Sequence, residues 1–225
     1  QLDRQARVRL RVQSDFEALI SLRRQCEVAE SEIACGPALS SSQPALNAEL
    51  PAGGYFVIVD GAVRNEGGDY VLALETAPVP APRSEEEACA AAPQLLLDGP
   101  RQELDTFHGT ATSHSSCGGE DAPDVAFTFR LASAGRVTVF VSDFEFEPVF
   151  ALRRACEYVE SELLCVAWER PPGSELTSAE YPALSLDLPA GAYALVVDGQ
   201  SASSMGAGSV RLGFEAQSTR QPVPR

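Results

Sequence analysis

Lysine is absent from this chain: all 17 basic residues are arginines, set against 32 acidic residues, and the formal net charge is −15 over 225 residues. No run of 18 apolar residues occurs either, so the sequence predicts no membrane-spanning segment. Such acidity disfavours nucleic acid and anionic membranes as partners, because phosphate binding needs clustered cations. Hydrophobic residues make up 44% of the chain, enough for a packed core. The first ten residues lack the apolar stretch of a signal peptide, so we expect any export signal to have been removed or to lie upstream.

Histidine is scarce, and the motifs of catalysis are missing. The two histidines, His108 and His114, lie in a serine-rich polar stretch where Asp105 or Asp121 could complete a triad on paper. No G-x-S-x-G elbow accompanies them, and their spacing fits no common metal motif. We therefore predict that the chain is not an enzyme and has no catalytic residue and no metal site.

Two Val-Asp-Gly sequences, ending at Gly61 and Gly199, occupy matching places in the chain. We predict that Asp60 and Asp198 form turns in which the glycines take a positive φ. No D-x-D-x-D-G loop supports a calcium site. We expect no cofactor, with calcium the one ion left open.

The chain contains a duplicated module. Ser14–Cys35 and Ser142–Cys165 both read SDFE, an apolar stretch, LRR-x-Cys, eight residues and a second cysteine. Leu50–Gly61 and Leu188–Gly199 then share LPAG-[GA]-Y and end in VDG. Kept order and near-equal spacing indicate repetition of one structural unit.

Six cysteines follow this repeat. Because the C-x8-C unit occurs once per module, the economical set of disulfides is Cys26–Cys35, Cys156–Cys165 and Cys89–Cys117. Zinc is the alternative, but zinc sites usually need C-x2-4-C pairs and none is present. Three disulfides would indicate an oxidising compartment, so we expect the protein to be secreted or at the cell surface.

Strand patterns dominate the sequence. Apolar and polar residues alternate over Val125–Leu131 and Val137–Ser142, while Tyr70–Glu75 and Val210–Glu215 fit closing strands. We predict an all-β protein of two tandem jelly-roll-like β-sandwich modules. The predicted division is residues 1–75 for module 1, 76–87 for a Pro/Ala/Glu linker, 88–216 for module 2 and 217–225 for a C-terminal tail.

Module 1 lacks an opening strand in this division, because residues 88–130 of module 2 have no counterpart before Arg7–Val12. A sandwich short of a strand leaves an edge with unpaired backbone groups, and such an edge can accept a strand from elsewhere. Two outcomes stay open. Module 1 is completed by another segment, such as 76–82 or 219–225 of this or another copy, which can propagate into a filament, or it tolerates the gap.

Three arginines, Arg7, Arg9 and Arg11, alternate with apolar residues along one predicted strand. They form either the solvated face of that strand or an interaction stripe for carboxylates, such as the acidic run Glu85–Glu87.

Taken together, the SDFE…LRR-x-C…C unit, the LPAG…VDG unit, the closing strand and DAPDVAFTFRL at 121–131 resemble the bacterial pre-peptidase C-terminal (PPC-like) domain repeated in secreted proteins. The resemblance covers most of both modules. It implies a jelly-roll β-sandwich with an accessory or binding role and no catalysis. Family members often carry acidic residues after the second cysteine, where this chain has Gly36-Pro37 and Val166-Ala167, so the resemblance implies no calcium site there.

These observations favour a non-catalytic extracellular structural or interaction protein acting in adhesion or assembly, with protein partners that include further copies of itself. Two alternatives stay open: an accessory substrate-binding or export region of a secreted hydrolase, and a calcium-dependent carbohydrate- or protein-binding module.

Overall fold

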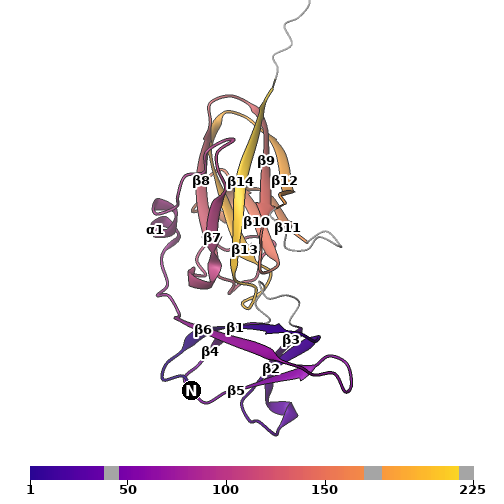
Figure 1. Cartoon of the computed structure of the whole chain (residues 1–225). Helices are drawn as coiled ribbons and strands as arrows, with labels where there is room; N and C mark the ends of the chain where they lie inside the picture. Colours follow the sequence, from indigo (N-terminus) through magenta and orange to yellow (C-terminus); the bar gives the residue numbers. More distant parts are fainter. Residues whose placement is uncertain (38–45, 170–178, 218–225) are drawn as a thin grey trace, which may run out of the picture.

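The computed structural model describes residues 1–37, 46–169 and 179–217. Its strands form four antiparallel sheets, arranged as two sandwich-like modules stacked along one axis (Figure 1). The all-β prediction is therefore confirmed. Within the described ranges, no helix is long and apolar enough to cross a membrane.

Module 1 has two three-stranded sheets. In spatial order they are β4 (Leu46–Leu50), β1 (Ala6–Ser14) and β6 (Tyr70–Pro78), then β3 (Glu32–Pro37), β2 (Ala18–Arg23) and β5 (Phe56–Gly61). A short 3-10 helix, η1 (Ala29–Ser31), precedes β3. Alternate side chains of β1 face inward, and Leu10 packs in one apolar cluster with Ile20 of β2 and Leu46 of β4. This alternation is what a strand with one face on the core requires.

Module 2 has two four-stranded sheets. In spatial order they are β12 (Tyr181–Leu188), β9 (Gly135–Ser142), β14 (Ala207–Ala216) and β7 (Gln102–Asp105), then β11 (Glu162–Ala167), β10 (Pro148–Arg153), β13 (Gly191–Gly199) and β8 (Val125–Leu131). The helical pieces are α1 (Glu85–Ala90), η2 (Thr106–His108) and η3 (Val159–Ser161). One large apolar cluster, including Phe127, Phe150 and Leu212, fills the space between the sheets.

The six strands of module 1 repeat the order of β9 to β14, so the duplication seen in the sequence is a duplication of sheet topology. Strands β7 and β8, however, have no counterpart among the described residues of module 1. We predicted one missing strand, whereas one is missing from each sheet. Strand β7 escaped notice because it is short and reads Gln-Glu-Leu-Asp, without the alternation that marks β8.

The predicted linker at 76–87 is regular structure at both ends. Strand β6 continues to Pro78, which lies opposite Ala6 in β1, because pairing with that long strand extends the ladder. The acidic run forms the first turn of α1, where Ser84 and Glu87 make a capping box. Of the predicted tail, residues 218–225 lie outside the described residues.

The junction between the modules is built on the arginine stripe. Of the two alternatives left open by the sequence, the solvated face is wrong for Arg7 and Arg9. Arg7 and Arg9 are only 3% and 4% exposed, because η2 of module 2 covers this face of β1. Arg7 Nη1 donates hydrogen bonds to the backbone oxygens of Phe107, at 2.8 Å, and Gly109, at 2.6 Å. Burial lowers the pKa of the Arg7 guanidinium from its ordinary value, yet four hydrogen-bond acceptors surround it: Glu49 and the backbone oxygens of Thr106, Phe107 and Gly109.

Carboxylates of module 2 meet the rest of the stripe. Arg9 Nη2 lies 2.9 Å from Asp105 Oδ1, and the Arg9 guanidinium stands 4.0 Å above the Phe107 ring. Arg11 Nη2 lies 2.7 Å from Glu145 Oε1. The stripe therefore holds the two modules together through Asp105 and Glu145, not through the acidic run named in the prediction, which begins α1 on the other sheet of module 2.

Candidate interaction surface

In module 2, residues 88–131 cover the two strand edges that module 1 leaves open. Strand β8 pairs with β13 over seven residues, and β7 pairs with β14 over four. The counterparts of β13 and β14 in module 1 are β5 and β6, each of which has one hydrogen-bonded neighbour strand among the described residues. The strands that cover these edges in module 2 therefore indicate what kind of segment could pair with β5 and β6 in module 1.

Disulfides fasten the covering segment, and our predicted pairing is wrong. The structure has the disulfides Cys89–Cys156 and Cys117–Cys165, and it leaves Cys26 and Cys35 as exposed thiols. The two cysteines of the C-x8-C unit do not turn toward each other. Cys156 packs with Cys89 of α1 on the outer face of the sheet, while Cys165 of β11 bonds to the loop that precedes β8. Each therefore anchors a different part of the covering segment.

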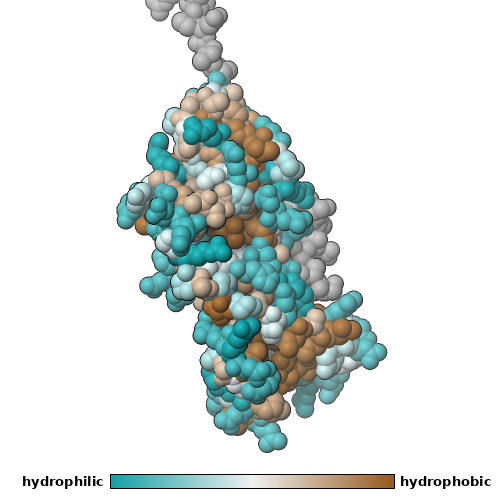
Figure 2. Space-filling view, turned by 90° about the vertical axis from the view of Figure 1, so that its left-hand side faces the viewer, coloured by the Kyte–Doolittle hydropathy of each residue, from teal (hydrophilic) through white to brown (hydrophobic). Residues whose placement is uncertain are grey.

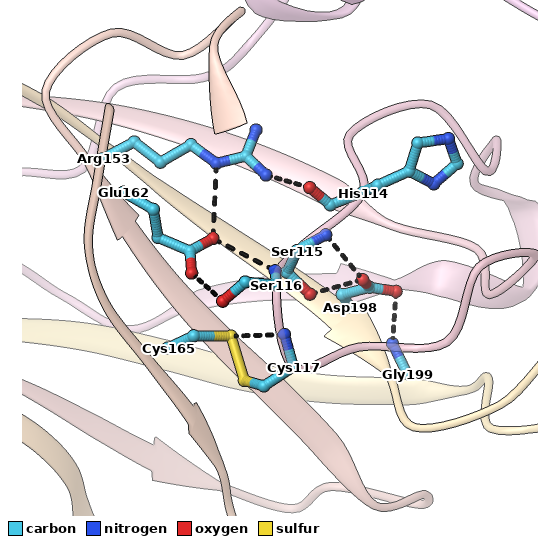
Figure 3. Close-up of a disulfide and its surroundings, with 9 residues drawn as sticks. All are labelled: His114, Ser115, Ser116, Cys117, Arg153, Glu162, Cys165, Asp198 and Gly199. Atoms are coloured by element: carbon cyan, nitrogen blue, oxygen red, sulfur yellow. Dashed lines mark hydrogen bonds and ion pairs between the residues drawn. A yellow bond between two sulfur atoms is a disulfide. The ribbon is translucent and has the colours of Figure 1, made fainter. Parts of the chain in front are cut away.

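Around the second disulfide, buried charges hold the same loop (Figure 3). Arg153 is fully buried and donates a hydrogen bond from Nη2 to the backbone oxygen of His114. Its Nε lies 3.8 Å from Glu162 Oε2. Glu162 accepts hydrogen bonds from the Ser116 hydroxyl and, at 3.3 Å, from the Ser116 backbone N–H. This arrangement neutralises the buried guanidinium and fixes the loop, as buried charges require.

Asp198, also drawn in Figure 3, is the other anchor of the loop. It is 1% exposed and accepts hydrogen bonds from the Ser115 hydroxyl at 2.7 Å and the Gly199 backbone N–H at 2.7 Å. Burial raises its pKa to about 6. A Cβ at Gly118 would lie 2.2 Å from Asp198 Oδ2, so this part of the loop requires glycine.

The predicted turn role of the Val-Asp-Gly motifs holds in part. In each, the glycine N–H donates to the preceding aspartate, at 2.9 Å for Gly61 and 2.7 Å for Gly199. Neither glycine has a positive φ, which corrects that part of the prediction. Glycine is needed because a Cβ would lie 2.6 Å from Glu66 O at the first site and 2.0 Å from Ser204 O at the second.

Module 1 keeps the anchoring groups without the loop. Arg23, Glu32 and Asp60 stand at the places of Arg153, Glu162 and Asp198 in the aligned repeats. Arg23 Nη2 lies 3.6 Å from Glu32 Oε2, and their side chains are 23% and 37% exposed. Our sequence reasoning did not single out Glu32 as functional, although its identity across the repeat was the signal that could have found it.

The inner face of β6 is open as well. Tyr70, Leu72 and Leu74 lie opposite the inward-facing side of β1 but are 51%, 38% and 61% exposed. The equivalents of the first two in module 2, Val210 and Leu212, are 1% and 0% exposed. The difference in exposure follows from β8, because its Phe127 and Phe129 pack in one cluster with Val210 and Leu212.

Apolar surface consequently gathers on module 1, as the brown patch over the lower part of the molecule in Figure 2 shows. Among the described residues, ten large apolar side chains are exposed, and eight of them belong to this smaller module: Val28, Ile33, Phe56, Val63, Tyr70, Val71, Leu72 and Leu74. Concentrated exposed apolar surface on a folded domain is typical of an interaction site.

The histidines form no site together. His108 is exposed beside Glu75 and Asp105, with Nε2 at 3.7 and 3.8 Å from their oxygens. His114 contributes its backbone oxygen to the buried network described above. In the part of the chain that the structure describes, no group of three or more His, Cys, Asp or Glu side chains could hold a metal ion.

Comparison with known proteins gives distant structural likenesses. No protein-family model and no curated protein matches the chain. About half of the chain, 54%, matches 93% of the pre-peptidase C-terminal domain of a collagenase from Bacillus anthracis, with 14% identity and a TM-score of 0.35. The VP2 protein of infectious bursal disease virus matches over 93% of this chain, at 10% identity and a TM-score of 0.21, and the chain spans about half, 54%, of its length. Neither likeness says what this chain does.

Proposed function

We propose that the chain is a non-catalytic extracellular interaction protein, whose module 1 binds a β-strand-forming polypeptide along β5 and β6. The observation that carries the proposal is the pair of open edges at the places where module 2 carries β8 and β7. The two disulfides of module 2 are consistent with an oxidising, extracellular compartment.

Backbone chemistry supports strand addition. No strand of residues 1–37, 46–169 and 179–217 pairs with the outer edges of β5 and β6, whose N–H and C=O groups a new strand would satisfy, as β8 satisfies β13. Such pairing is largely independent of side chains, so specificity must come from the surface beneath the added strand.

Side chains on the inner face supply that surface. An alternating apolar strand placed beside β5 would cover Leu72 and the neighbouring Leu74, in the way that β8 packs in one cluster with Val210 and Leu212 in module 2. Full burial of one leucine side chain contributes about 2 kcal/mol, which favours a partner strand with large apolar residues at every second position.

The test is binding of a labelled peptide of residues 121–132, which contains the β8 sequence, to the chain and to its Leu74→Glu variant. Leu74 is 61% exposed, so the variant should fold normally. A carboxylate beneath an added strand should weaken peptide binding about ten-fold or more. Fluorescence anisotropy measures the dissociation constants.

Leu96→Glu is the matched control, because Leu96 is also 61% exposed but lies in module 2. It should leave binding unchanged. No detectable binding to the parent chain, or equal binding by the Leu74→Glu variant, would refute the proposal.

A further inference from the structure

The two exposed thiols of module 1 stand where module 2 has disulfides. In the repeats, Cys26 and Cys35 align with Cys156 and Cys165. The register agrees: Cys35 lies opposite Ser21 in the β3–β2 ladder, and Cys165 lies opposite Ala151 in the β11–β10 ladder. Cys35 thus lies at the place of Cys165, which bonds to the loop before β8, and Cys26 aligns with Cys156, which bonds to α1.

The charged groups of the docking site in module 2 are also repeated in module 1. Figure 3 shows Arg153, Glu162 and Asp198 converging on one side of the Cys117–Cys165 disulfide. Their counterparts in the aligned repeat are Arg23, Glu32 and Asp60, of which Arg23 and Glu32 form an ion pair at 3.6 Å. Among the described residues, no loop like that of module 2 contacts these three side chains. Both modules therefore carry the thiols, the guanidinium and the carboxylates of this docking site, but in the described parts of the chain only module 2 carries the segment that docks there.

We propose that module 1 binds, and links to itself through Cys26 and Cys35, a polypeptide segment of the same kind as residues 88–131. This inference rests on the proposed strand-binding function and names the partner. The partner carries one cysteine on a short helix, a second in a Ser-Ser-Cys-Gly-Gly loop, and then an alternating apolar strand, in that order.

A second copy of this chain does not fit as the donor. Its own residues 88–131 are fastened by two disulfides and by the pairing of β7 and β8 with their neighbours. Exchange between copies would break both disulfides and open module 2 in order to close module 1. The partner is therefore an additional segment whose cysteines are not already engaged.

The linkage is an oxidation of two thiol pairs. For each disulfide, one thiol of module 1 and one of the partner lose their S–H protons and two electrons, and an S–S bond forms. Oxidised glutathione, as the oxidant, accepts the two electrons and two protons, and its own S–S bond is broken to give two reduced glutathione molecules. The exposure of both thiols permits this exchange.

One side chain distinguishes the two docking sites. Phe56, 45% exposed, stands where module 2 has Ala194, which packs with Cys89 and Cys156 beneath α1. The partner of module 1 must therefore leave more room under its helix. A Phe56→Ala variant reproduces the smaller surface and suits residues 88–131 as a probe.

The experiment uses an isotope-labelled synthetic peptide of residues 88–131 in a glutathione redox buffer, with the parent chain and the Phe56→Ala variant. We expect a one-to-one adduct with the pairs Cys26–Cys89 and Cys35–Cys117, identified by non-reducing peptide mapping. A scrambled peptide with cysteines at the same two positions should react about ten-fold more slowly, because docking raises the effective concentration of the thiols. Asp60→Ala should slow capture of the Cys117 end about ten-fold, since it removes the acceptor of a charge-assisted hydrogen bond, and Asp60→Asn should restore part of the rate.

The outcomes separate this inference from the proposed function. A chain with both thiols replaced by serine should still bind the 121–132 peptide. Suppose that this serine variant binds the peptide, but that the adducts of the parent chain and of the Phe56→Ala variant have crossed pairing, or form no faster than with the scrambled peptide. The disulfide inference is then wrong, and strand binding stands. A native Cys26–Cys35 bond that resists exchange would overturn the inference as well. If the 121–132 peptide does not bind at all, the proposed function fails.

Discussion

Replacing Arg9 by alanine should uncouple the two modules. Arg9 is 4% exposed, pairs with Asp105 at 2.9 Å and lies 4.0 Å above the Phe107 ring. A hydrogen bond between charged groups contributes about 1.5–3 kcal/mol, and a cation–π contact contributes about 1. Since Asp105 is 31% exposed, water compensates part of its loss, and we expect a total loss of about 2–3 kcal/mol from the junction.

The chain provides its own reporter for this change. Trp168, the one tryptophan, is buried in the module 2 core, so its fluorescence follows that module alone. Far-UV circular dichroism follows the strands of both modules. In urea, the parent chain should give coincident transitions by the two probes, whereas the variant should lose dichroism first, because module 1 depends on the junction more than the larger module does.

Arg136→Ala is the matched control. It removes an Arg–Asp pair of similar geometry, at 2.8 Å to Asp187, whose side chains are 55% and 49% exposed. Exposed pairs contribute little, so the transitions of this variant should coincide with those of the parent. If the Arg9 variant keeps coincident transitions at the same midpoint as the Arg136 variant, the stripe does not hold the modules together and our reasoning on the junction is wrong.

Two further predictions concern the disulfides and pH. Cys117→Ser should lower the free energy of unfolding by about 4 kcal/mol on the chain-entropy model, because the disulfide spans 48 residues. Cys35→Ser, at the equivalent place of module 1, should cause no measurable loss in urea unfolding. Equal losses in the two variants would contradict the assigned pairing. The pKa of Asp198 is raised to about 6 in the folded chain, so between about pH 4 and 6 the folded state keeps a proton that the unfolded state loses. The contribution of this group to stability should therefore be greatest below about pH 4 and fall as the pH rises to about 6. Asp198→Asn should flatten that fall in urea unfolding between pH 4 and 7, although Asp124, whose pKa burial also raises, keeps part of the slope; an unchanged slope would show that Asp198 is not the titrating group.

The sequence alone was enough to predict the duplicated all-β architecture, because its signals are local. Alternation over Val125–Leu131 places every second side chain on the core, and the structure has β8 there. The repeated units kept their order, so the topology of β1 to β6 matches that of β9 to β14. The docking arginine and carboxylates could have been found from the same repeat.

Only the tertiary structure decided which residues meet. Cysteine spacing suggested Cys156–Cys165, but those side chains face different parts of the covering segment, whose position depends on the whole sandwich. The buried contacts of Arg7 and Arg9 depend likewise on η2, about 100 residues further along the chain. A strand's alternation indicates which side chains share a face, but it carries no information on what covers that face, because packing between distant segments decides whether the charges on it stay in water or find partners.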